Sequence, residues 1–270
     1  MMERRSGDLL SRVGIALVGA PAVLALIWAG GWWLFALATV AGVVALDELW
    51  RMTRSLRPLA IAGYAGAALA LVGAELGGVD TLLAGFVATF PLAFLLKGVA
   101  ETKTTTTVSV SATVLGAGWV GLGLGFLLLL RDLPEHGVLV VVTVLLAVWA
   151  NDTLAYFAGR AFGRHRLAPL VSPGKTWEGF AAGTVASIAV AFFAMYDQGF
   201  LEIWQAIVLG VVIAIAGPVG DLFESAVKRD MQVKDTGRVL GSHGGMLDRI
   251  DALLFAAAAA YFLLDAFNRV

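Results

Sequence analysis

The segment 228–251, KRDMQVKDTGRVLGSHGGMLDRID, gathers acidic and basic side chains in a chain that is otherwise mostly apolar. Two carboxylates three residues apart, Asp248 and Asp251, precede an apolar run, so a helix that starts there would point both the same way. The His-Gly-Gly sequence at 243–245 permits a tight turn and a close approach of the backbone to an anion. Carboxylates hold Mg²⁺, while Lys and Arg neutralise the phosphate oxygens that the metal does not reach. These residue types indicate chemistry on phosphate groups.

Two further carboxylates lie within apolar segments, Asp152 in VWANDTLAYFAG and Asp221 in AGPVGDLFESAVKR. A charged Asp at the centre of a membrane helix costs about 2.5 to 3.5 kcal/mol, so such residues usually face a cavity. At about 100° per residue, Glu224, Ser225 and Lys228 share a helix face with Asp221. The ordinary alternative for each of these residues is an interfacial position in contact with water.

The composition indicates the class of protein that carries these charges. Of the 270 residues, 59% are apolar and 14% charged, with a mean hydropathy of +0.86, whereas a globular domain has about 45–50% apolar and about 25% charged residues. We therefore predict an all-α polytopic integral membrane protein with a single transmembrane domain over 1–270. The absence of cysteine excludes disulfides, thiolate metal sites and a Cys nucleophile.

Nine apolar runs, bounded by charges or by Pro and Gly clusters, are candidate membrane spans. They are 13–30, 32–47, 59–74, 79–96, 108–130, 138–162, 178–196, 203–223 and 251–267. With nine spans and a cytoplasmic N-terminus, every Lys and Arg except Arg131 and Arg269 falls in a cytoplasmic segment, as the positive-inside rule requires. The polar loops 160–177 and 224–250 then share the cytoplasmic face, where we expect them to form the active site.

The charged segment also has a specific pattern of residues. From its N-terminal end this pattern comprises Ser225, Lys228, Arg229, Lys234, Asp235, Gly241, Ser242, His243, Gly244, Gly245, Asp248, Arg249, Ile250 and Asp251. It spans 27 residues and resembles the signature of the phosphatidate cytidylyltransferase family. The segment 151–179, NDTLAYFAGRAFGRHRLAPLVSPGKTWEG, is similar to another well-marked segment of that family. The chain departs from many members at Gly241 and Ser242, where they have Pro-Gly, which bears on the stiffness of the turn but not on the groups it presents.

The resemblance implies a reaction and its partners. CTP and phosphatidic acid would give CDP-diacylglycerol and pyrophosphate, with Mg²⁺ as cofactor and, as in some relatives, a second, monovalent cation such as K⁺. The attacking group would be the phosphate oxygen of the lipid, so no covalent intermediate is needed. The expected partners are CTP, phosphatidic acid, membrane lipid and a second copy in a homodimer, without nucleic acid. The expected location is the inner membrane, multi-pass, with the active site facing the cytoplasm.

The resemblance also implies roles for residues. Asp221 and Asp248 are expected to hold the metal, and Lys228, Arg229 and Asp251 to complete the catalytic group. The expected substrate contacts are Asp152, Ser172, Lys175, Thr176, Glu178, Ser225, Lys234, Asp235, Arg238, His243, Gly244, Gly245 and Arg249. Thr176 and Glu178 have an alternative role, because they also lie where a helix cap is expected, at the start of the seventh span.

Other classes of protein fit less well. Gly-Lys-Thr at 174–176 ends a Walker A loop elsewhere, but such a loop requires a Gly where this chain has Pro169. A secondary transporter would carry few charges, near the bilayer midplane, whereas this chain concentrates charge at one face. A polyprenol kinase or a cytidylyltransferase for archaeal ether lipids is a closer alternative, and the signature favours the diacyl lipid without excluding either.

Overall fold

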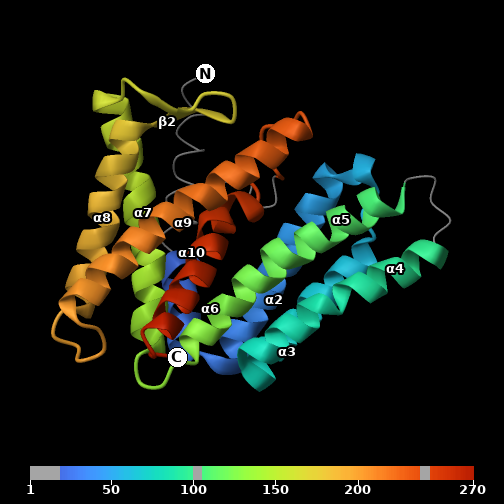
Figure 1. Ribbon diagram of the computed structural model, residues 1–270, viewed down its shortest axis with the longest axis horizontal. Coiled ribbons are helices and arrows are strands. Elements are labelled where there is room, and N and C mark those ends of the chain that lie inside the picture. Colours follow the sequence, from blue (N-terminus) through green and yellow to red (C-terminus); the bar gives the residue numbers. More distant parts are fainter. Residues whose placement is uncertain (1–18, 100–104, 238–243) are drawn as a thin grey trace.

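The computed structural model describes residues 19–99, 105–237 and 244–270, and within them it is a bundle of helices with one small sheet (Figure 1). This agrees with the predicted all-α membrane architecture. After a short apolar helix, Gly19–Ala29, the elements are α2 (Gly31–Met52), η1 (Arg54–Leu56), α3 (Ala60–Val87), α4 (Thr89–Val99), α5 (Thr106–Gly116), η2 (Ala117–Leu122), α6 (Gly123–Arg131), α7 (Gly137–Phe162), β1 (Arg166–Ala168), β2 (Ser172–Thr176), α8 (Trp177–Met195), α9 (Ile203–Asp230) and α10 (Leu247–Ala266).

Six helical stretches in the described residues are long and apolar enough to cross a membrane. They are Gly31–Met52, Ala60–Val99, Thr106–Arg131, Gly137–Phe162, Trp177–Met195 and Ile203–Asp230. The second stretch is interrupted at Gly78, whose φ of 80° is in the left-handed region that glycine adopts without strain. Gly85 packs against the backbone of Leu69, so the chain reverses its direction between these two residues. The reversal lies between the predicted spans 59–74 and 79–96, while the total of nine spans stays a prediction.

The core of the bundle surrounds α10, which packs against α2, α6, α7 and α9. Leu247, Leu254 and Leu264 of this helix are almost fully buried. Glycines allow the helices to approach closely: a side chain at Gly123 would meet Leu254 at 2.6 Å. The helix α5–α6 contains a π-helical stretch, η2, at this contact. Although α10 is not among the six apolar stretches, it therefore lies at the centre of the part of the bundle formed by α2, α6, α7 and α9.

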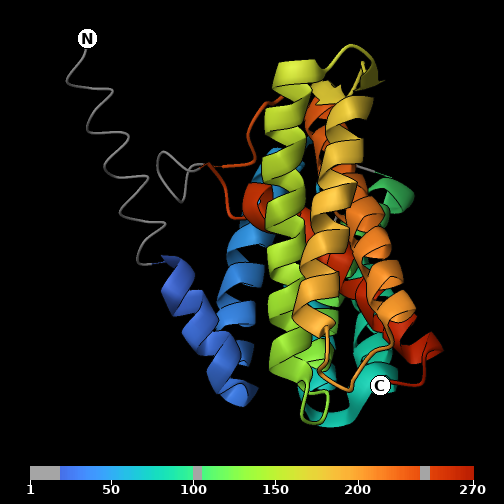
Figure 2. The ribbon, with the colours of Figure 1, turned by 90° about the vertical axis from the view of Figure 1, so that its left-hand side faces the viewer.

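The two predicted polar loops are more ordered than expected. In the first, α7 continues to Phe162 and is followed by β1 and β2, which pair antiparallel with Arg166 opposite Thr176. Figure 2 shows these strands at one end of the adjacent helices α7 and α8. In the second, α9 runs two turns beyond the predicted boundary at 223, to Asp230. Loop 224–250 is therefore partly helix, and α10 begins within it, at Leu247.

Candidate active site

Three carboxylates form a group where α9 meets α10: Asp221 and Glu224 on α9, and Asp251 on α10. One oxygen from each lies within 4.8 Å of the others. The two helices can approach because residue 220 is glycine, where a Cβ would come 2.5 Å from the carbonyl oxygen of Asp251. Glu224 and Asp251 are buried, with exposed fractions of 1% and 7%. Burying several carboxylates together is costly unless cations compensate their charge.

The donor set of this acidic group fits a divalent cation. All its ligand atoms are carboxylate oxygens, the type that Mg²⁺ prefers in proteins. The buried Oε1 of Glu224 has no hydrogen-bond partner among the described residues, so it retains its capacity to coordinate. We conclude that Asp221, Glu224 and Asp251 have the chemistry and spacing of a metal site.

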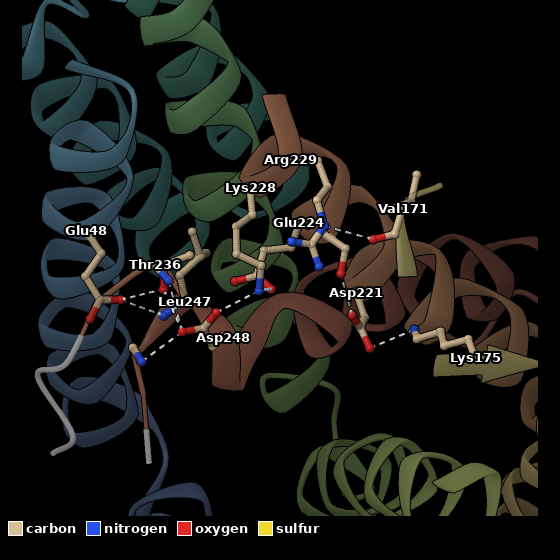
Figure 3. A network of polar contacts seen from close by, with 12 residues as sticks. Glu48, Val171, Lys175, Asp221, Glu224, Lys228, Arg229, Thr236, Leu247 and Asp248 are labelled. Atoms are coloured by element: carbon tan, nitrogen blue, oxygen red, sulfur yellow. Dashed lines mark hydrogen bonds and ion pairs between the residues drawn. The ribbon is translucent and has the colours of Figure 1, made fainter. Parts of the chain in front are cut away.

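Lys228 connects this group to Asp248. Its Nζ lies 2.6 Å from Oε2 of Glu224 and 2.8 Å from Oδ1 of Asp248 (Figure 3). All three side chains are largely buried. The Lys228 ammonium group therefore compensates two carboxylates that would otherwise face each other in a poorly hydrated region.

The second oxygen of Asp248 is occupied by hydrogen bonds. Oδ2 accepts from Oγ1 of Thr236 at 2.9 Å, from the Thr236 N–H at 3.3 Å and from the Gly245 N–H at 2.9 Å. The predicted metal pair was Asp221 and Asp248. The structure instead groups Asp221 with Glu224 and Asp251, and places Asp248 in the adjacent network. A metal-binding role for Asp248 stays a prediction.

Lys175 brings the β-hairpin to the acidic group. Its Nζ forms an ion pair with Oδ2 of Asp221 at 2.7 Å (Figure 3). The same Nζ lies 3.5 Å from the carbonyl oxygen of Pro218. Ser225 donates from Oγ to the other oxygen of Asp221 at 3.3 Å. Pro218 lacks an N–H, so it cannot donate to the carbonyl oxygen of Ala214 as a helical residue normally would. The Ala214 carbonyl oxygen accepts from Nδ2 of Asn151 at 3.5 Å instead.

A cavity of about 690 Å³ opens beside Asp221, between α7, the β-hairpin, α8 and α9. Five residues predicted from the sequence line it: Asp152, Ser172, Lys175, Thr176 and Asp221. Arg160 and Arg166 also line it. These two were not predicted as site residues, although both carry positive charge within the segment 151–179 that resembles a well-marked segment of the family. The cavity thus combines cations and carboxylates, as a site for a charged phosphate compound requires.

The other predicted residues of the hairpin region have mainly structural contacts. Thr176 caps α8, because its Oγ1 accepts the Gly179 N–H at 3.1 Å, so the alternative of a helix cap is confirmed for Thr176. Glu178 accepts from His165, with Nδ1 and Oε1 2.7 Å apart, and so ties the start of α8 to the strand region. Arg229 donates from Nε to the carbonyl oxygen of Val171 at 3.3 Å, which joins α9 to the hairpin turn.

The remaining predicted residues lie around the start of α10. Lys234 and Asp235 are exposed, and Arg249 is exposed in the first turn of α10. Gly244 has a φ of 80°, which explains the need for glycine there. Arg238 and His243 lie outside the described residues.

Glu48 of α2 was not predicted as part of the site, although its side chain reaches this network. Its Oε2 accepts the Leu247 N–H at 3.0 Å and lies 3.5 Å from Oγ1 of Thr236 (Figure 3). Glu48 is only 1% exposed. Its sole signal in the sequence was a carboxylate near the end of an apolar run.

Comparison with known proteins agrees with this geometry. Residues 10–267 match the model of the cytidylyltransferase family. A phosphatidate cytidylyltransferase of Brucella abortus biovar 1 (strain 9-941) is 35% identical over 255 residues, which cover 94% of this chain and 92% of that protein. Phosphatidate cytidylyltransferases of Bacillus subtilis (strain 168) and Haemophilus influenzae (strain ATCC 51907 / DSM 11121 / KW20 / Rd) are 38% and 42% identical over 140 and 134 residues, covering 52% and 48% of this chain. In these two, the match spans about half of the relative's length, 52% and 46%. Since the family model covers nearly the whole sequence, the chain belongs to the cytidylyltransferase family.

Proposed function

We propose that this protein transfers a cytidylyl group from CTP to phosphatidic acid, giving CDP-diacylglycerol and pyrophosphate. A phosphate oxygen of the lipid attacks the α-phosphorus of CTP, and the bond from that phosphorus to the oxygen bridging to the β-phosphate breaks. The observation that carries the proposal is the acidic group with Lys175 and Lys228, located beside a cavity in a bundle of apolar helices. The names of the relatives support the choice of substrates.

The chief obstacle to this reaction is electrostatic. Two like unit charges about 4 Å apart repel by about 4 kcal/mol at an effective dielectric constant of 20, and here a phosphate monoester approaches a triphosphate. Lys175 and the arginines that line the cavity, Arg160 and Arg166, are available to neutralise the phosphate oxygens. Asp221, Glu224 and Asp251, with Asp248 as a further predicted ligand, would hold Mg²⁺, which neutralises part of the triphosphate charge when bound.

We further propose nine spans, a cytoplasmic N-terminus and an active site on the cytoplasmic side of the inner membrane. The distribution of Lys and Arg supports this orientation, because only Arg131 and Arg269 fall on the opposite side. The orientation would give soluble CTP access to the cavity from the cytosol. A second, monovalent cation and a homodimer stay predictions from the resemblance.

The reaction is tested with purified protein, phosphatidic acid, Mg²⁺ and CTP labelled at either the α- or the γ-phosphate. We expect the α-label in the lipid product, the γ-label in pyrophosphate, and no product in the presence of EDTA. A lipid kinase would instead place the γ-label in lipid, and a transporter would label no lipid. Parallel reactions with a polyprenol and with an archaeal ether-lipid phosphate separate the alternatives, and preference for either over phosphatidic acid would contradict the proposal.

Replacing Lys175 by Met should mainly weaken substrate binding. Its largely buried ammonium group lies in the cavity, and loss of one interaction with a charged group is worth about 1.5–3 kcal/mol. We expect the KM for CTP or phosphatidic acid to rise about tenfold or more, measured from initial rates. Arg51→Met is the matched control, because Arg51 is an exposed cation paired with Asp47 outside the cavity. Unchanged KM values for both substrates would exclude Lys175 from substrate binding.

A further inference from the structure

Glu48 caps a helix from a distant part of the chain. The first N–H groups of a helix have no acceptor within the helix, and negative charge near them is favourable. Met246, the residue before α10, makes no side-chain capping bond. Instead, Oε2 of Glu48 accepts the N–H of Leu247, the first residue of α10, at 3.0 Å. The start of α10 is therefore fixed by a buried carboxylate from α2.

The Glu48 carboxylate also packs against two glycines near Asp248, Gly237 and Gly245. Gly237 lies directly in front of Oε1 of Glu48, where a Cβ would collide with that oxygen. At Gly245, a Cβ would come 2.6 Å from Oε2 of Glu48 and 2.9 Å from Oδ2 of Asp248. Residues 237 and 245 thus pack against Glu48 without room for a side chain.

Thr236 links this packing to Asp248. Its hydroxyl has one proton to donate and lies 2.9 Å from Oδ2 of Asp248 but 3.5 Å from Oε2 of Glu48, so the proton belongs to the shorter contact. Through Asp248, the contacts continue to Lys228 and from there to Glu224 in the acidic group. A continuous series of contacts therefore runs from α2 to the carboxylates that fit a metal.

We propose that Glu48 is a positioning residue for cytidylyl transfer. It fixes the start of α10 and residues 236–237, and thereby the orientation of Asp248 and Lys228 beside the acidic group. Glu48 does not line the cavity and is 1% exposed, so it acts through these residues and not on the substrate. The inference rests on the proposed function, since its effect is measured on that reaction.

Two substitutions at position 48 test the proposal. Glu48→Ala removes the acceptor, and we expect kcat to fall about 30-fold, the effect of losing one hydrogen bond to a charged group. The KM for CTP and phosphatidic acid should stay within about twofold, while the Mg²⁺ concentration for half-maximal rate rises. Glu48→Gln keeps an oxygen that accepts the Leu247 N–H, so we expect it to retain most of the activity. Asp47→Ala is the matched control, since Asp47 is the neighbouring carboxylate, is exposed and pairs with Arg51.

A second variant makes the test independent of a general loss of folded protein. Gly237 has no positive φ, so Ala fits its backbone, but the added methyl group would displace the Glu48 carboxylate. We expect Gly237→Ala to lower kcat in the natural chain and to have no additional effect in Glu48→Ala, because coupled sites are not additive. Rates are compared per folded molecule, measured by size-exclusion chromatography.

Different results would overturn the positioning role of Glu48 and the proposed function. Multiplicative losses in the double variant, or a Glu48→Ala protein with normal kcat and Mg²⁺ dependence, would overturn the positioning role and leave the proposed function intact. A natural chain that forms no CDP-diacylglycerol would overturn the proposed function itself.

Discussion

Replacing Asp221 by Asn is expected to lower the rate of CDP-diacylglycerol formation about a thousandfold while the protein stays folded. Asp221 belongs to the acidic group, pairs with Lys175 and lines the cavity. Asn has nearly the same shape, so the change removes a charge and leaves the packing. Loss of a metal carboxylate is expected to cost about 4 kcal/mol of transition-state stabilisation, which corresponds to about a thousandfold in rate. Initial rates with labelled CTP at saturating Mg²⁺ measure the effect.

The matched control is Asp230→Asn. Asp230 is the last residue of the same helix, α9, and is exposed. We expect its rate to stay within about twofold of that of the natural chain. An Asp221→Asn protein with a comparable rate would remove Asp221 from the active site and would leave the acidic group without a catalytic role.

Lys228→Met should have the largest effect on stability. Without the ammonium group, Glu224 and Asp248 both lose the cation with which they pair. Removing one partner of a buried ion pair typically costs about 3–5 kcal/mol. For a protein of this size we expect the midpoint of thermal unfolding to fall by about 10 °C, measured in detergent by loss of the monodisperse peak. Adding Glu224→Gln should restore much of the loss, because one of the two opposed charges is then removed.

Arg51→Met provides the comparison for Lys228→Met. Arg51 pairs with Asp47 at the same helical spacing as Lys228 with Glu224, but the side chains are 76% and 40% exposed. Exposed pairs contribute about 0–1 kcal/mol, so we expect a shift of about 2 °C or less. Equal shifts in the two variants would show that burial of Lys228 has no energetic consequence and would contradict its assigned role.

The sequence predicted the helices well because a membrane span needs little more than about 20 apolar residues in a row. The predicted span 138–162 starts one residue after α7 and ends with it. The predicted span 178–196 starts and ends one residue after α8. The prediction was less accurate for α9, since hydropathy falls at 223 whereas the helix continues to Asp230. Polar residues such as Glu224 and Lys228 are good helix formers, so the backbone stays helical where the apolar surface stops.

Parts of the site depend on contacts that local sequence does not encode. The strand β2, SPGKT, contains Pro and Gly, which ordinarily weaken strands, and it forms through pairing with β1. Asp221 and Asp248 have similar signals in the sequence, yet their partners differ because Asp251 approaches Asp221 across the helix interface while Thr236 and Gly245 donate to Asp248. Glu48 escaped prediction for the same reason, since its partner Leu247 lies near the other end of the chain.

The contact between Gly237 and Glu48 also constrains how related sequences can diverge. A larger residue at 237 requires that the side chain at 48 first become shorter or turn away. Substitutions at these two positions are therefore expected to arise in a fixed order, with position 48 changing before position 237. Homologues without an acidic residue at 48 should be those that carry residues other than glycine at 237.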